Sequence, residues 1–253
     1  MQIEKPPEQR TAFLKRFLGG LLELVYPRIC LSCRKKLPEG PSGERVCPQC
    51  WNAVKRCVPP FCRRCGRHLQ NVASGRDICS ECMRKHLHFD RAFSACSYEG
   101  VIKELIHQFK YGGRSYLGPS LGKLMAEHAR QYRLPLEVVD CIIPVPLHSA
   151  KLREREFNQA EVLGSFVARE FNKEMLDGCL IRRLPTKAQA DLGSNERFTN
   201  VRGSFTVKAP QAVAGKNILL VDDVLTTGAT SSEAALALKN AGAGIVFVLT
   251  LAN

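Results

Sequence analysis

The chain has 253 residues, 45% of them hydrophobic and 24% charged, a size that allows one substantial core and a small additional module. No stretch approaches the roughly 18 consecutive apolar residues that a membrane-spanning helix needs, and the N-terminus lacks a signal-peptide pattern, so we expect a cytoplasmic protein. The formal net charge of +13, with most of the basic excess in the first 90 residues, is compatible with an anionic partner such as nucleic acid.

The N-terminal segment, residues 1–25, is expected to form a polar tail followed by a short amphipathic helix. Residues 1–10 are polar and contain Pro6-Pro7, whereas apolar side chains recur at helical spacing over residues 11–25. Two interpretations of this apolar stripe stay open. The first, which we favour, is packing onto the body of the protein, and the second is contact with a membrane surface.

Residues 26–90 carry a cysteine repeat that predicts a double zinc ribbon. Eight of the twelve cysteines form Cys-x-x-Cys pairs, and the second set of four follows the first at a displacement of 32 residues. Structural zinc takes four thiolates in a tetrahedron, and each Cys-x-x-Cys turn supplies two of them. The repeat therefore predicts two structural zinc sites, paired either sequentially or in a cross-braced manner. The predicted ligands are Cys30, Cys33, Cys47 and Cys50, followed by Cys62, Cys65, Cys79 and Cys82.

The rest of this module gives weaker signals. Basic residues lie on or beside the knuckles at residues 34–36, 55–56 and 63–64. Contact with nucleic acid and simple solvation are equally good interpretations of these charges. Four further cysteines of the chain fit neither half of the repeat and are expected to be small buried hydrophobic residues. They are Cys57, Cys96, Cys141 and Cys179.

Residues 91–253 have the pattern of a second, α/β domain. Apolar runs predict strands at residues 92–98, 138–144, 179–183, 218–221 and 244–251, and amphipathic segments predict helices at residues 101–109, 120–131, 158–171 and 231–240. This alternation indicates a doubly wound, mostly parallel sheet, which binds ligands beyond the carboxyl ends of its strands. Residues 149–155 are expected to form a basic loop at that edge. Residues 184–204 form a long polar segment that is either functional or mobile.

The stretch NILLVDDVLTTGAT, residues 217–230, is the most informative part of the chain. A buried strand ends in Asp222 and Asp223, a Thr/Gly turn follows, and a helix begins. Backbone N–H groups and the positive end of the helix dipole therefore converge at a point that suits a phosphate, and the two carboxylates could hold the vicinal hydroxyls of an attached ribose. An acidic pair alone is as often a solvated strand end with a helix cap, but the complete ordered motif is far more specific.

This stretch resembles the PRPP-binding motif of type I phosphoribosyltransferases. The resemblance implies that Asp222 and Asp223 bind the ribose hydroxyls as the catalytic pair, with Mg²⁺ bridging ribose and pyrophosphate. The residues implied around the 5′-phosphate are Thr226, Thr227, Gly228, Ala229 and Thr230. Our candidates for binding the pyrophosphate are Lys151, Arg153 and Arg155. Our candidates for closing over the site from the polar segment are Arg182, Arg183, Lys187 and Arg197.

Further motifs extend the resemblance to the ComF family, over roughly residues 13–252. Members are phosphoribosyltransferase-like proteins, several of them linked to DNA uptake in natural transformation. One departure is Glu156, which stands where the family usually has glycine, and its carboxylate would repel pyrophosphate if it pointed inward. The motifs are PVPLHSAKLREREFNQA at residues 144–160, VDDVLTTGAT, the leading double zinc ribbon, and a spaced set made of Thr186, Gln189, Leu192, Arg197 and Asn200.

The ComF resemblance implies a PRPP-binding protein that is implicated in DNA uptake, binds single-stranded DNA through its basic zinc module, and works with DNA-uptake proteins. The alternative is an active Mg²⁺-dependent phosphoribosyltransferase with an unknown base or amine acceptor. In that case the zinc module or residues 99–135 would supply the hood over the acceptor. Phosphoribosyltransferase folds also serve as non-catalytic PRPP sensors, so fold and motif predict the ligand class better than turnover.

Overall fold

The computed structural model describes residues 28–37, 45–69, 77–185 and 194–253. The chain forms two compact units, Met1–Ala53 and Val54–Asn253, so the second cysteine cluster belongs to the same unit as the α/β domain. The predicted tail and helix of residues 1–25 lie outside the described residues. Within the ranges given above, no helix is both long enough and apolar enough to cross a membrane.

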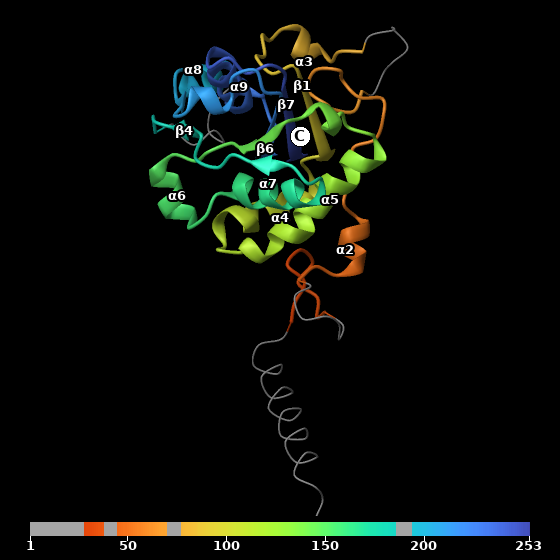
Figure 1. Ribbon diagram of the computed structural model, residues 1–253. Helices are drawn as coiled ribbons and strands as arrows, with labels where there is room; N and C mark the ends of the chain where they lie inside the picture. The colour runs from red at the N-terminus through yellow and green to blue at the C-terminus, as the bar shows by residue number, and fades with distance from the viewer. Residues whose placement is uncertain (1–27, 38–44, 70–76, 186–193) are drawn as a thin grey trace, which may run out of the picture. The chain divides into compact units, whose positions relative to one another are not determined.

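A five-stranded, all-parallel sheet forms the centre of the C-terminal unit, with strand order β1-β7-β6-β2-β3 (Figure 1). From β2 the chain continues outward to β3, whereas from β6 it continues in the opposite direction to β7. The sheet therefore has its topological switch point between β2 and β6, where such folds bind ligands. The strands are β1 (Arg91–Cys96), β2 (Cys141–Pro144), β3 (Glu174–Met175), β6 (Ile218–Val224) and β7 (Val246–Ala252).

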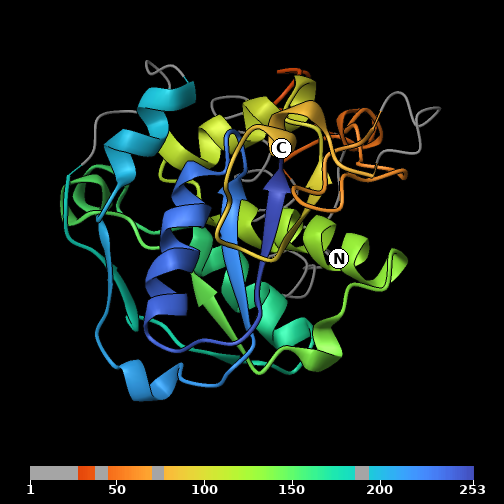
Figure 2. The same ribbon diagram turned by 90° about the horizontal axis from the view of Figure 1, so that it is seen from above.

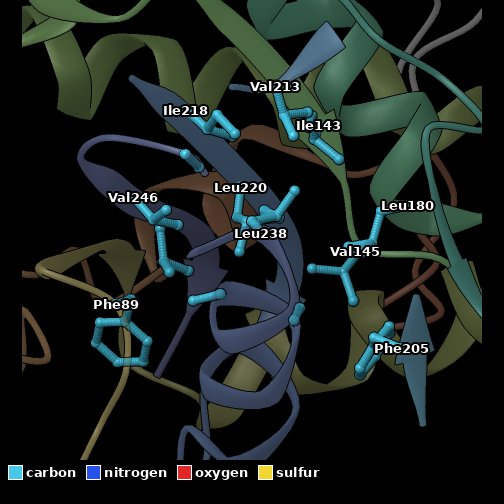
Figure 3. Packing of buried hydrophobic residues seen from close by; sticks show 14 of the residues in the cluster. Phe89, Ile143, Val145, Leu180, Phe205, Val213, Ile218, Leu220, Leu238 and Val246 are labelled. Atoms are coloured by element: carbon cyan, nitrogen blue, oxygen red, sulfur yellow. The ribbon is translucent and has the colours of Figure 1, made fainter. Parts of the chain in front are cut away.

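Helices cover both faces of this sheet (Figure 2). Helix α9 packs on one face, where Leu238 meets Ile218 and Leu220 of β6 in the main apolar core (Figure 3). Helices α5 and α7 pack on the other face and on each other. Double coverage explains why β6 begins with a continuous apolar run instead of an alternating one. The helices are α4 (Gly100–Tyr111), α5 (Gly118–Gln131), α7 (Gln159–Glu170) and α9 (Ala229–Asn240).

The predicted doubly wound fold is confirmed, and each of the four predicted helices is found within two residues of its predicted ends. The predicted strand at residues 179–183 is present but lies outside the main sheet, in an antiparallel pair of β4 and β5. The smaller elements are α2 (Pro48–Asn52), α3 (Ser80–Met83), α6 (Ser149–Arg155), α8 (Ser194–Val201), β4 (Leu180–Arg182), β5 (Phe205–Val207) and three short 3₁₀ turns at Ser115–Leu117, Leu136–Val138 and Pro210–Ala212.

The predicted basic loop at residues 149–155 was wrong, because these residues form helix α6. The His148 side chain caps the helix by accepting a hydrogen bond from the N–H of Ala150, and Glu156 ends it in a left-handed conformation with φ 67°. The polar segment after residue 183 likewise contains a helix, α8. In α6 the polar composition hides residues with good helix propensity, whereas α8 consists mainly of weaker helix formers.

The two zinc ribbons repeat their backbone hydrogen bonds as well as their cysteines. The N–H of Arg34 donates to the carbonyl of Cys30 at 2.9 Å, and the N–H of Gly66 donates to that of Cys62 at the same distance. Both Arg34 and Gly66 have positive φ, 62° and 72°. A side chain is therefore tolerated at this turn in the first ribbon.

Tertiary packing requires glycine at position 66, because a Cβ there would lie 2.6 Å from the carbonyl oxygen of Ala92 in β1. We expect Gly66→Ala to lower the free energy of unfolding by about 3 kcal/mol, from backbone overlap and left-handed strain together. Arg34→Ala, at the equivalent turn, is the matched control and should change it by less than about 1 kcal/mol. Urea unfolding with zinc present measures both, and equal effects would contradict this explanation.

His128 of α5 is buried at 5% exposure between the rings of Phe61 and Tyr132. Burial, with a smaller effect of Arg56, lowers the pKa of His128 from 6.5 to about 4. The unfolded chain therefore binds more protons than the folded chain between these values, so stability is lost as pH falls from 6.5 towards 4. We expect a loss of up to about 3 kcal/mol. Urea unfolding across this window should show the loss in the wild type and not in His128→Phe, and parallel profiles would contradict it.

Candidate functional site

Two clusters of four cysteines fit structural zinc. In each cluster the sulfur atoms lie within 4.8 Å of one another. The Cys33 and Cys47 sulfurs are 3.7 Å apart, as are those of Cys65 and Cys79, close to the spacing of about 3.8 Å that a tetrahedral zinc–thiolate site requires. The pairing is sequential, with residues 30–50 forming one site and residues 62–82 the other. The four cysteines outside the repeat are all buried, as predicted.

The segment that follows the second ribbon packs against the phosphate turn, residues 226–230. Leu87 and Phe89, which follow the ribbon, pack against Gly228, and the N–H of His88 donates to the hydroxyl of Ser232 at 3.0 Å. Gly228 has φ 80° and precedes α9 as its N-cap, a conformation that favours glycine. The segment that follows the zinc ligands therefore contacts both the turn that the sequence predicts to bind a phosphate and the first turn of α9.

A cavity of about 510 Å³ lies at the switch point of the sheet, beyond the carboxyl ends of β2 and β6. Both Asp222 and Asp223 line it. Burial, reinforced by the neighbouring charge of Asp223, raises the pKa of Asp222 well above its usual value. Asp223 is only 8% exposed, and its Oδ2 lies 2.7 Å from the Nζ of Lys110. The acidic pair is therefore held inside the cavity beside a cation and is not a solvated strand end.

Five basic side chains and two carboxylates line this cavity among the residues that the structure describes, so its charge favours a polyanion. Burial, together with the charges of Arg155 and Arg182, lowers the pKa of Lys151. Burial also lowers the pKa of Arg182, against the opposing effect of Asp222. Crowded, partly desolvated cations of this kind are stabilised by a bound anion. The five are Lys110, Lys151, Arg155, Arg182 and Arg197.

The structure brings some of the predicted site residues together and leaves others apart. Thr226 and Thr230 line the cavity with the acidic pair, and Thr227, Gly228 and Ala229 form the turn and the start of α9. Arg197 of α8 donates to the hydroxyl of Thr226 at 3.2 Å. Arg153 and Arg183 are exposed and do not line the cavity. Lys187, Thr186, Gln189 and Leu192 lie outside the described residues.

The departure at Glu156 does not place a carboxylate among the lining residues. Glu156 is exposed, and its carboxylate faces the turn at Gly113, where a Cβ would lie 3.1 Å from Oε2. Its left-handed φ of 67° shows why glycine is the more natural residue here. Because Glu156 does not point into the cavity, its carboxylate does not repel an anion there.

Sequence reasoning missed the side chains that α4 and the start of α7 contribute. Lys110 carries no local signal, because its partner Asp223 is distant in sequence. Gln159 of α7 and Tyr111 of α4 hold the predicted Arg155, which donates to Oε1 of Gln159 at 3.1 Å and to the hydroxyl of Tyr111 at 3.3 Å. Asn158 caps α7 and donates to the carbonyl of Val145 at 3.2 Å. The Phe-Asn-Gln-Ala motif thus positions the cavity wall.

Comparisons with known proteins agree with both halves of this architecture. A family described as "Double zinc ribbon domain" matches residues 21–83, and one described as "Phosphoribosyl transferase domain" matches residues 159–253. The DNA utilization protein YhgH of Shigella flexneri is 31% identical over 231 residues, which cover 90% of this chain and 98% of that protein. The chain belongs to the ComF family.

Other relatives of this ComF-family protein carry competence names. Competence protein F of Haemophilus influenzae is 28% identical, covering 68% of this chain and 76% of that protein. Competence protein ComFC of Bacillus subtilis is 26% identical, covering 85% and 79%. Among solved structures, glutamine PRPP amidotransferase from B. subtilis, complexed with ADP and GMP, overlaps 56% of this chain and 30% of its own, with 21% identity and a TM-score of 0.39.

Proposed function

We propose that this ComF-family protein binds PRPP in the cavity at the switch point and acts in the handling of DNA during competence. The observation that carries the proposal is the convergence of five cations around the acidic pair of half-buried Asp222 and buried Asp223, beside a glycine turn that opens a helix. PRPP offers matching groups, namely two vicinal hydroxyls, a 5′-phosphate and a pyrophosphate. The names of the relatives support the link to DNA.

Within the cavity, each group would meet a different part of the ligand. Asp222 and Asp223 accept hydrogen bonds from the ribose hydroxyls, and the turn at residues 226–230 binds the 5′-phosphate through backbone N–H groups. Lys151 and Arg155, on and at the end of α6, face the pyrophosphate, and Arg182 and Arg197 add charge from β4 and α8. Mg²⁺ prefers carboxylate and phosphate oxygens, so the acidic pair would hold it, and it would neutralise charge on the pyrophosphate.

Calorimetric titration of PRPP with Mg²⁺ into the zinc-loaded protein tests this function, with pyrophosphate release followed in the same samples. We expect saturable binding, weakened about tenfold or more in Lys151→Gln/Arg155→Gln, since each removes a charge-assisted hydrogen bond. Arg153→Gln, on the exposed side of α6, is the matched control and should bind normally. Release of pyrophosphate would show that the site cleaves PRPP, with water taking the phosphoribosyl group when no other acceptor is present, and failure of the wild type to bind PRPP would overturn the proposal.

The zinc ribbons support the second part of the proposal, binding of single-stranded DNA. Lys35 and Lys36 are exposed on the first knuckle, whereas Lys55, Arg56 and Arg63 form ion pairs with acidic side chains. The first knuckle is therefore the better candidate for phosphate contacts. Affinity for a labelled single strand should fall steeply with salt, and its salt dependence should be shallower in Lys35→Gln/Lys36→Gln than in the control Lys55→Gln. Binding that ignores salt would contradict this assignment.

A further inference from the structure

A second cavity, which we call the ribbon cavity, lies between the second zinc ribbon and the phosphate turn. Its volume is about 450 Å³, within the range of about 300–1,000 Å³ typical of small-molecule sites. It shares Tyr98, Arg197 and Thr226 with the PRPP cavity, so the two cavities adjoin. A ligand in the ribbon cavity would therefore sit beside the proposed phosphoribosyl group.

The floor of the ribbon cavity is apolar and firmly held. Leu87, Phe89 and Leu225 line it and are 3%, 1% and 3% exposed. Leu87 and Phe89 pack on Gly228, and the N–H of Leu225 donates to the carbonyl of Ala252 at 2.9 Å. These three side chains are almost fully buried and close the bottom of the cavity, so the surface open to a heterocyclic ring comes from half-buried Tyr98 and from the groups at the rim.

Three cations surround this floor. Among the residues that the structure describes, Arg67, Lys85 and Arg197 line the ribbon cavity together with one carboxylate, that of Glu81, whose Oε2 lies 2.5 Å from the Nζ of Lys85. The excess positive charge suits a phosphate. Guanidinium groups and the Tyr98 ring also stack on nucleobases. The Tyr98 ring and the cationic rim together match a ring that carries an anionic group.

We propose that the ribbon cavity binds one nucleotide unit, with its base against the Tyr98 ring and its phosphate at Arg67 and Lys85. The same chemistry is offered by a free nucleotide and by the terminal nucleotide of a single DNA strand. The proposal deepens the DNA-related part of the proposed function and rests on it for biological context. It places a second ligand next to PRPP and makes the second zinc ribbon part of the binding site.

The test titrates dAMP, and separately a 5′-phosphorylated tetradeoxyadenylate, into the full-length zinc-loaded protein. Arg67→Gln/Lys85→Gln should weaken both ligands about tenfold or more. Lys151→Gln/Arg155→Gln, which alters only the PRPP cavity, should leave both affinities within about twofold, and so should Arg84→Gln, an exposed residue outside both cavities. Two zinc ions per chain and an unchanged melting temperature would show that each variant is folded.

The two ligands distinguish the sources, because a strand bound about tenfold tighter than dAMP indicates a DNA terminus and equal affinities indicate a free nucleotide. The proposal is overturned if neither ligand saturates by about 5 mM, which corresponds to about 3 kcal/mol of binding. It is also overturned if nucleotide affinity responds to Lys151 and Arg155 instead of Arg67 and Lys85. PRPP titrated into the same variants should show the reverse pattern. If PRPP does not bind but the nucleotides do, the proposed function is contradicted and the nucleotide site in the ribbon cavity is retained.

Discussion

Asp222→Asn/Asp223→Asn is expected to weaken Mg²⁺-dependent PRPP binding by about 100-fold. Asparagine keeps the shape of the side chain but removes the charge, so hydrogen bonds from the ribose hydroxyls to ionised acceptors, worth about 1.5–3 kcal/mol each, are lost. The substitution also leaves Lys110, 18% exposed and 2.7 Å from Asp223 in the wild type, without its ion-pair partner. Calorimetry with and without Mg²⁺ measures the effect.

Inorganic phosphate is the control ligand for this variant. It should bind the variant as well as the wild type or better, because the turn at residues 226–230 is unchanged and the cavity has become more positive. Tighter PRPP binding by the variant would contradict the assignment. In that case the cavity would recognise only the phosphates of the ligand, through its net charge, and the acidic pair would have no role in holding the ribose.

Cys62→Ser should affect the C-terminal unit far more than Cys30→Ser does, although each removes one zinc. Structural zinc contributes apparent binding free energies of about 10–16 kcal/mol to zinc-finger peptides. The cluster containing Cys62 belongs to the unit of Val54–Asn253, and the segment after it packs under Gly228. Loss of that zinc should therefore lower the melting temperature of this unit by about 10 °C or more, at roughly 2–4 °C per kcal/mol, and weaken PRPP binding.

Cys30→Ser is the matched comparison, because its cluster belongs to the other unit. It should lose one zinc by atomic absorption, keep the calorimetric transition of the C-terminal unit and keep its PRPP affinity. If both variants lowered the transition equally, the two clusters would be energetically equivalent, and the special support of the phosphate turn by the second ribbon would be wrong. If neither did, the Cys62 cluster would contribute nothing to the fold of its unit.

Local patterns were enough to predict the two clusters of four cysteines and the strand, turn and helix of residues 217–230. Cysteine spacing depends only on the geometry of a metal knuckle, and the strand, acidic pair, turn and helix follow one another without a gap. Sequential zinc pairing needed the structure, because the spacing alone fits both pairings. Helix α6 was missed because its basic residues were interpreted by charge and not by helix propensity.

The partners of the acidic pair could not be predicted, because they depend on packing between distant segments. Lys110 reaches Asp223 from the end of α4, and nothing near either residue in the sequence signals the contact. The ribbon cavity likewise exists only because Leu87 and Phe89 pack beneath residues that follow β6. The sequence thus predicted the helices and strands that carry candidate site residues. Packing between these elements determines which side chains meet in each cavity.

The contrast between Arg34 and Gly66 means that the two zinc ribbons are copies in form but not interchangeable parts. They share the 32-residue spacing and the same left-handed turn. In the second copy the turn lies against Ala92, and a side chain is excluded there. A chimera that exchanged the two ribbons would bring an arginine to the surface of β1, so each copy is confined to its own place in the chain.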